Sequence, residues 1–254
     1  MKLVGERRAL AAVIMAFYFL AYGVLAVSRM APDMTRALMA IAGVYGLAFF
    51  ALVAGYFWAR WFAVGVGLYG VINSAVGIWQ LGAEPVLLFI GGTHLAATVF
   101  LWGQAMSEPY DGQAAWREKF HMDDSAVQRL GRSVIRAGIG LPIVLIYAFA
   151  PRPDPASAAL LLAVVALAGF GVRGLVQLRT WGVLALGVAG ALTLGLFGAD
   201  VAAHGAGAVI PHVPVAGGAV MAAFTAPLFA AIAGVALLAA AVPFLAPIAR
   251  FVRR

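Results

Sequence analysis

Long runs of apolar residues, separated by short polar segments, make up most of the chain. A helix needs about 20 consecutive apolar residues to cross the hydrocarbon core of a bilayer. The pattern therefore predicts an all-α fold, a polytopic transmembrane helical bundle of about eight spans. The spans are expected at roughly 9–28, 37–58, 62–81, 86–106, 134–150, 157–178, 181–200 and 219–247.

The composition supports the membrane class. Hydrophobic residues make up 64% of the chain and charged residues only 11%, whereas a soluble domain carries about 25% charged residues. A water-soluble fold of this length could not bury so much apolar surface. We therefore expect an integral protein of a bacterial cytoplasmic (inner) membrane, with the lipid bilayer as its main partner.

The basic residues predict the orientation of the chain. The chain has 17 Lys and Arg residues against 10 Asp and Glu residues. Such an excess of basic residues can indicate nucleic-acid binding. Here the basic residues lie at the ends of apolar spans, so we expect no nucleic-acid partner. With the N-terminus in the cytoplasm, 14 of the 17 fall on the cytoplasmic side, and only Arg29, Arg36 and Arg152 fall outside. This bias predicts that both termini are cytoplasmic.

The chain also shows signs of an internal duplication. The third and seventh spans match at five positions with a constant separation of 120 residues: Trp61 with Trp181, Gly67 with Gly187, Gly70 with Gly190, Asn73 with Thr193 and Gln80 with Asp200. Chance matching between Gly-rich and Ala-rich spans is the alternative. A duplication with four spans in each unit would place the two halves parallel to each other.

This pattern divides the chain into two units. Residues 1–122 are expected to form an N-terminal four-span unit with a polar, Tyr-rich interior. Residues 123–254 are expected to form an interfacial amphipathic helix followed by a C-terminal four-span unit rich in Ala and Gly.

The polar segment 107–133 joins the halves. Ser125 and Gln128 have the spacing of a capping box, and Val127, Leu130 and Val134 then share one face of a helix. We expect a short helix over 123–133 that lies on the inner membrane surface and runs into the fifth span. An ordinary solvated connector is the alternative. In the first interpretation the side chains that contact lipid headgroups are Arg129, Arg132 and Arg136.

Two features near the C-terminus predict irregular structure. The segment 201–218 is long, apolar and rich in Gly and Pro, so it must lie on the outer surface or re-enter the membrane under protein cover. Pro227 and Pro243 predict a kink or a break in the last span.

The sequence lacks the residues and motifs that several kinds of transport and catalysis require. No Asp, Glu, Lys or Arg lies clearly in the middle third of a predicted span, which argues against an ion-coupled pump. The chain has no cysteine, and it has no hydrolase, metalloprotease or P-loop motif. We therefore expect no enzymatic activity, no catalytic residue and no metal site.

Polar side chains within the spans are concentrated in the first half. In hydrocarbon, buried hydroxyl and amide groups need hydrogen-bond partners, so we expect these groups to face one another inside the N-terminal unit. They then act as polar contacts between helices or, alternatively, as the binding site of a small amphiphile such as a lipid or a quinone. The residues concerned are Tyr18, Tyr22, Tyr45, Tyr69, Asn73, Gln80, His94 and Thr98.

His94 is the only histidine within a predicted span. A b-type haem with two histidine ligands would need a second histidine at similar depth, and the candidates His204 and His212 lie at or beyond the outer end of the seventh span. We therefore expect no cofactor and a neutral, hydrogen-bonded His94. The haem alternative remains open at this point.

These observations favour a non-enzymatic scaffold or accessory subunit of a membrane complex. The small-residue runs 65–70 and 234–246 would let its helices pack closely against other membrane proteins or a second copy of the chain. A carrier or binder of a small apolar or amphiphilic molecule is the alternative. A haem b-bearing electron-transfer subunit comes third.

The predicted topology can be tested by cysteine labelling, because the native chain has no cysteine. Single substitutions Ser107→Cys and Ser157→Cys should react with a membrane-impermeant thiol reagent from opposite sides, Ser107→Cys from the cytoplasm. Reaction of both from the same side would refute the eight-span topology.

Overall fold

The computed structural model describes residues 4–28, 32–107, 109–110, 118, 123–149, 155–205 and 227–252. Within these residues all regular structure is helical, and there is no strand. The long helices are α1 (Val4–Val27), α2 (Thr35–Ala54), α3 (Ala59–Leu81), α4 (Pro85–Leu101), α6 (Asp124–Phe149), α7 (Pro155–Val176), α8 (Thr180–His204) and α10 (Pro227–Val252). Two short 3-10 helices, η1 (Pro32–Met34) and η2 (Gln104–Met106), lie between them.

The long helices confirm the predicted polytopic bundle of about eight spans. Seven helices among the described residues are long and apolar enough to cross a membrane, and α4 is shorter. Its 17 residues extend about 26 Å, slightly less than the hydrocarbon thickness of about 30 Å. The helix ends before residue 106 because Trp102 is extended and Gly103 has a positive φ of 103°.

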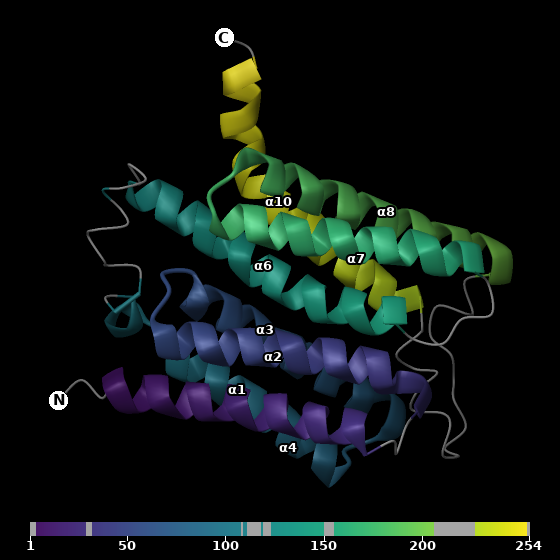
Figure 1. The fold of residues 1–254 in the computed structure, drawn as a ribbon, viewed down its shortest axis with the longest axis horizontal. Helices are drawn as coiled ribbons and strands as arrows, with labels where there is room; N and C mark the ends of the chain where they lie inside the picture. Colours follow the sequence, from purple (N-terminus) through teal and green to yellow (C-terminus); the bar gives the residue numbers. More distant parts are fainter. Residues whose placement is uncertain are drawn as a thin grey trace.

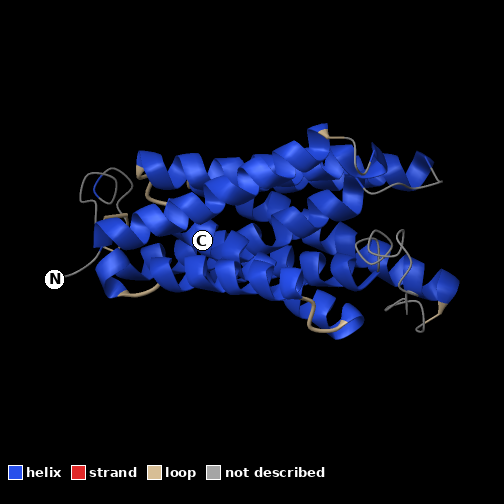
Figure 2. Cartoon of the chain, turned by 90° about the horizontal axis from the view of Figure 1, so that it is seen from below, coloured by secondary structure: helices blue, strands red, loops and turns tan. Residues whose placement is uncertain are grey.

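The helices run side by side along one direction (Figures 1 and 2). In the first half, α1 and α3 each pack against both α2 and α4. In the second half, α6 and α8 each pack against both α7 and α10. The order of neighbours is therefore the same in both halves, whereas their origin by duplication stays a prediction.

Close contact between α3 and α6 joins the two halves. A Cβ atom added to Gly138 would lie 2.9 Å from the Phe62 carbonyl oxygen, and one added to Gly65 would overlap the Ile135 carbonyl oxygen. One turn away, a Cβ on Gly131 would lie 2.8 Å from the Trp61 indole ring. Only glycine lets the two backbones approach this closely.

The start of α6 differs from the prediction in its cap. The cap is Asp123, whose Oδ1 accepts hydrogen bonds from the Ala126 N–H and the Ser125 hydroxyl, so Ser125 and Gln128 form no capping box. The helix then continues without interruption through the fifth span. Val127, Leu130 and Val134 do share a buried face, but this face belongs to the protein core. Residues 124–133 are therefore helical and continuous with the fifth span, as expected, and their location at the membrane surface stays a prediction.

The cap of α6 depends on pH. Hydrogen bonds from the Ala126 N–H and the Ser125 hydroxyl lower the pKa of the Asp123 carboxyl group, and the Arg129 charge adds to this effect. The contribution of Asp123 to the start of α6 is therefore complete above the ordinary pKa of aspartate. It is lost as the pH falls through the lowered value.

The last helix is bent but not broken. Pro227 is its first residue, while Pro243 and Pro247 lie inside it, and Figure 1 shows its C-terminal part turning away from the bundle. Pro243 has no N–H, so the carbonyl of Ala239 loses its donor within the helix. Arg136 of α6 replaces that donor, with Nη1 at 2.8 Å from the Ala239 oxygen.

Two adjacent arginines in α1 bind the C-terminal ends of two other helices. Arg8 donates to the Leu52 oxygen at 2.7 Å and to the Val53 oxygen at 2.9 Å, at the end of α2. Arg7 donates to the Val99 oxygen at 3.0 Å and also to the Trp102 oxygen, at the end of α4. Both guanidinium groups bond carbonyls at the C-terminal end of a helix, where the regular i to i+4 hydrogen bonds stop, and their charge complements the helix dipole.

Some predicted features lie outside the described residues. They include His212 and most of the segment 201–218, within which the described part is the end of α8 and Gly205.

The contact between α3 and α6 leads to a stability prediction. Gly65→Ala should lower the stability of the folded bundle by about 1–3 kcal/mol because the added methyl group overlaps the Ile135 carbonyl. The matched control is Gly43→Ala, at a lipid-facing position of α2 with no atom within 4 Å of an added Cβ. Thermal or denaturant unfolding in detergent measures both variants. Equal stability of the two would show that the close approach of α3 and α6 is absent.

Candidate functional site

The polar residues of α4 lie against a row of small residues on α3. A Cβ on Gly70 would overlap the His94 imidazole ring, and one on Gly67 would overlap the Thr98 hydroxyl. A Cβ on Gly91 would in turn lie 3.1 Å from the Ser74 Cβ. The two helices run antiparallel, so that three pairs face each other in register: Gly67 with Thr98, Gly70 with His94 and Ser74 with Gly91.

His94 is fully buried and both of its ring nitrogens are hydrogen-bonded. Nδ1 lies 2.7 Å from the carbonyl oxygen of Ile90, one turn earlier in α4. Since a carbonyl can only accept, Nδ1 carries the hydrogen. Nε2 lies 2.5 Å from the Tyr45 hydroxyl of α2, and in the neutral ring Nε2 is an acceptor, so Tyr45 donates. The structure confirms that His94 is hydrogen-bonded inside the N-terminal half.

Aromatic rings from α1 and α2 surround this histidine. The Tyr18 ring lies 4.2 Å from the imidazole and 5.3 Å from the Tyr45 ring, centroid to centroid. The Tyr22 ring stacks on Tyr45 at 5.5 Å. The Tyr18 hydroxyl is 2.6 Å from the Thr93 hydroxyl, which itself donates to the backbone of α4. The cluster therefore connects α1, α2 and α4 through hydroxyl and imidazole groups.

The structure brings most of the predicted site residues together, but not all of them. Tyr69 of α3 is fully buried and lies near Tyr22 and Tyr45. Asn73 and Gln80 lie farther along α3, and among the described residues no hydrogen bond joins either of them to the cluster. The residues brought together are Tyr18, Tyr22, Tyr45, Tyr69, His94 and Thr98. Their binding of a ligand stays a prediction.

Sequence reasoning missed Thr93 and the glycine partners of α4. The face of α3 that meets His94 carries Gly67, Gly70 and Ser74. This face is adjacent to the one that carries Tyr69 and Asn73, the polar residues predicted as part of the site. The matching steps of three and four residues, 67–70–74 on α3 and 91–94–98 on α4, were a signal that could have identified this contact.

The geometry bears on the haem alternative. Iron ligation through Nε2 of His94 would require the Tyr45 hydroxyl to leave its present position. His204 is the last residue of α8, in the other half of the chain. Among the described residues no group of three His, Cys, Asp or Glu side chains is placed to hold a metal ion. His212, the other candidate second ligand, lies outside the described residues, so the haem alternative stays a prediction.

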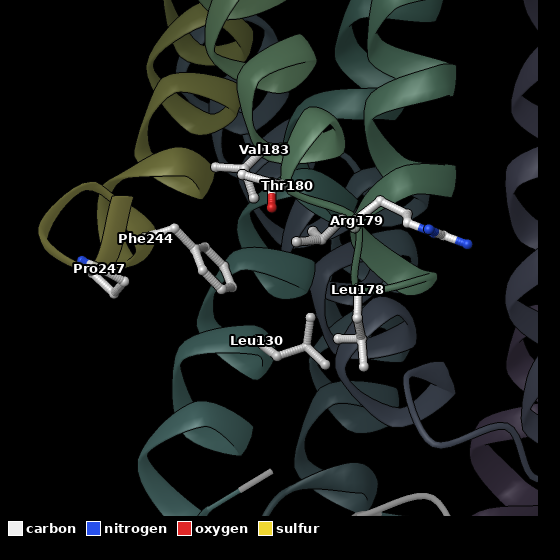
Figure 3. Close-up of a pocket in the computed structure, with 8 residues that line it drawn as sticks. Leu130, Leu178, Arg179, Thr180, Val183, Phe244 and Pro247 are labelled. Carbon is white, nitrogen blue, oxygen red and sulfur yellow. The ribbon is translucent and has the colours of Figure 1, made fainter. Parts of the chain in front are cut away.

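A separate pocket of about 500 Å3 lies in the second half, at the end of the bundle where α7 ends and α8 begins (Figure 3). Its surface is mostly apolar. In Figure 3 the Thr180 hydroxyl points into the space between the apolar side chains, whereas the Arg179 guanidinium points away from them. The pocket is lined by Leu130, Leu175, Leu178, Arg179, Thr180, Val183, Phe244 and Pro247.

The turn that forms one wall of this pocket is strained. Leu178 has a φ of 57°, a left-handed conformation that is unfavourable for a residue with a branched side chain. The turn is closed by a hydrogen bond of 2.8 Å from the Arg179 N–H to the Gly174 carbonyl. Glycine would adopt this backbone conformation without strain. Leucine at position 178 instead places an apolar side chain in the wall of the pocket.

No protein-family model, curated protein or solved structure matches this chain.

The hydrogen bond between Tyr45 and His94 leads to a second stability prediction. Tyr45→Phe should lower the stability by about 1–3 kcal/mol, because it leaves Nε2 of a buried imidazole without its donor. Tyr22→Phe is the matched control, since Tyr22 belongs to the same ring stack but does not bond His94. His94→Gln keeps hydrogen-bonding capacity and should stay within about 1–2 kcal/mol of the parent.

A double-mutant cycle and a spectrum complete this test. In the variant that already carries His94→Gln, the additional change Tyr45→Phe should destabilise less than in the parent chain, because the two residues are coupled. Additive effects would contradict the bond. A Soret band in the parent protein that His94→Gln abolishes would establish haem ligation instead.

Proposed function

We propose that this polytopic membrane protein binds one small, mostly apolar molecule from the bilayer in the pocket beside Thr180. The observation that carries this proposal is a space of about 500 Å3 lined by side chains of α6, α7, α8 and α10 and by the turn after α7. Binding sites for small molecules are concave and mostly apolar, with a few polar groups that fix orientation. A carrier or binder is the function that the sequence ranked second, although the sequence placed its site in the polar cluster of the first half rather than in this pocket.

The lining supports a particular class of ligand. The Thr180 hydroxyl can both donate and accept a hydrogen bond, and the Arg179 guanidinium points elsewhere (Figure 3). A neutral molecule with an extended apolar body and a single hydroxyl or carbonyl group matches this lining. A ligand with a charged group in the pocket would meet apolar side chains on most sides and would pay for its desolvation.

The scaffold function has lost part of its support. Gly65, Gly70 and Gly234 belong to the small-residue runs that were expected to meet a partner. An added Cβ on any of the three would instead meet other helices of this chain. Association with other membrane proteins or with a second copy stays a prediction, and the experiment below tests it.

The orientation belongs to this proposal as well. Arg7 and Arg8 lie beside the ends of α4 and α2, and Arg60 and Arg132 line one pocket with the segment after α4. This collection of basic side chains at one end of the bundle supports a cytoplasmic location for that end and for both termini, in a bacterial cytoplasmic membrane.

Native mass spectrometry of the full chain released from membrane nanodiscs tests the function. We expect a stoichiometric adduct of one small molecule that organic extraction removes and identifies. A bound partner chain without such an adduct would favour the scaffold. An apo monomer with neither would refute both functions.

Two pairs of variants assign the adduct to the pocket. Val183→Phe should fill the pocket and displace the adduct, whereas Leu184→Phe, on the lipid-facing side of the same turn, should keep it. Thr180→Val should lower its occupancy about 2–10-fold, the effect of one hydrogen bond. Thr193→Val, whose hydroxyl bonds the backbone of the same helix, should leave occupancy unchanged. Equal effects within either pair would exclude this pocket.

A further inference from the structure

We infer that Leu178 is a ligand-contacting residue of the pocket beside Thr180, and that its strained backbone is retained because its side chain binds the apolar body of the ligand. This inference rests on the proposed function. It adds the direction in which the ligand lies and the side chain that holds its apolar end.

The end of α7 is a Schellman motif, in which the residue after the helix has a left-handed backbone. The Arg179 N–H donates to the Gly174 oxygen at 2.8 Å. The Leu178 N–H donates to the Leu175 oxygen at 3.0 Å. Among the described residues Leu178 is the only one other than glycine with a positive φ. Glycine is the usual residue at this position because it has no Cβ to clash in the left-handed conformation.

The corresponding turn of the first half does have glycine. The motif at the end of α2 is the same: the Tyr56 N–H donates to the Ala51 oxygen at 3.2 Å. The Gly55 N–H donates to the Leu52 oxygen at 3.3 Å, and Gly55 has a φ of 74°. The α2–α3 and α7–α8 turns hold the same place in the order of helices. The turn geometry therefore does not itself require leucine at position 178.

The side chain of Leu178 has two sets of surroundings. It is half-buried, packs against the protein core and lines the pocket. A strained residue persists where its surroundings fix its conformation, and such residues cluster at ligand sites. Glycine would keep the turn and relieve the strain, but it would leave this part of the pocket without an apolar wall.

Figure 3 shows how the lining is divided. Thr180 and Val183 lie at one end of the space, Leu130 and Leu178 lie at the other, and the Phe244 ring lies between them. A ligand that bonds the Thr180 hydroxyl therefore extends its apolar body past Phe244 toward Leu178. Contact with the leucine side chain then contributes to affinity in proportion to the apolar area that it buries.

The experiment uses the full chain in nanodiscs and one neutral probe, hexadecanol with a photoreactive diazirine in its alkyl chain. Irradiation followed by peptide mapping identifies the labelled segments. Excess unlabelled hexadecanol distinguishes labelling at a saturable site from general labelling of the lipid-facing surface. In the parent chain we expect saturable labelling of the segments of α6, α8 and α10 that line the pocket.

Three substitutions at one position separate the backbone from the side chain. Leu178→Gly and Leu178→Ala both remove the side chain, but only Leu178→Gly relieves the strain, so it should melt at a higher temperature than Leu178→Ala. Both should reduce saturable labelling at least about fivefold. Leu178→Met keeps an apolar side chain of similar volume and should keep labelling within about twofold.

A control variant separates binding from stability. Leu186 is fully buried in α8 and does not line the pocket, so Leu186→Ala should melt below the parent and keep its saturable labelling. An equal loss of labelling in Leu186→Ala and Leu178→Gly would show that labelling follows stability, and it would overturn the inference. A melting temperature of Leu178→Ala at or above that of Leu178→Gly would overturn it as well.

The proposed function and this inference fail in different ways. A parent chain without saturable labelling refutes occupation of the pocket by this class of ligand, and the role of Leu178 falls with it. Saturable labelling that Leu178→Gly leaves intact supports the proposed function and overturns only the role of Leu178.

Discussion

The hydrocarbon core of a membrane contains no water, so each buried carbonyl, hydroxyl and imidazole must find its partner within the protein. Much of this structure follows from that constraint. Arg7 and Arg8 bind carbonyls at the C-terminal ends of α4 and α2, and Arg136 binds the carbonyl that Pro243 leaves without a donor. Each of these bonds joins helices that are distant in sequence. The hydrogen bonds that supply donors to these backbone carbonyls therefore also hold the helices of the bundle together.

A second consequence is the role of glycine in α3. One face of this helix meets α4 through Gly67 and Gly70, and another meets α6 through Gly65. Lipid chains are as apolar as the side chains they touch, so helices gain little from burial alone and depend on close contact. Gly70 lets α3 approach the ring of His94, whose nitrogens Ile90 and Tyr45 satisfy. The polar cluster and the small-residue row therefore depend on each other.

The number and approximate limits of the helices could be predicted because bilayer thickness sets the length of an apolar run. The polar cluster could be predicted in part, since Tyr45 and His94 have no alternative partner in lipid. The rotation of each helix could not, because lipid-facing and protein-facing sides are both apolar and leave no clear periodicity. Expectations therefore failed where rotation or local geometry decides, as for the Asp123 cap and for Thr93.

The number of basic residues at one end of the bundle indicates its orientation in the membrane, but it does not show which of them could bind a ligand. Arg8, Arg132 and Arg136 contribute equally to the positive charge at one end of the bundle, yet their surroundings differ. Arg8 and Arg136 bind carbonyls at 2.7 and 2.8 Å and complete the fold, whereas Arg132 has a bond of 3.5 Å to its own helix and lines a pocket. A guanidinium whose hydrogen bonds are satisfied by backbone has few donors left for a ligand. Binding is therefore to be sought where a basic side chain faces a cavity instead of a helix end.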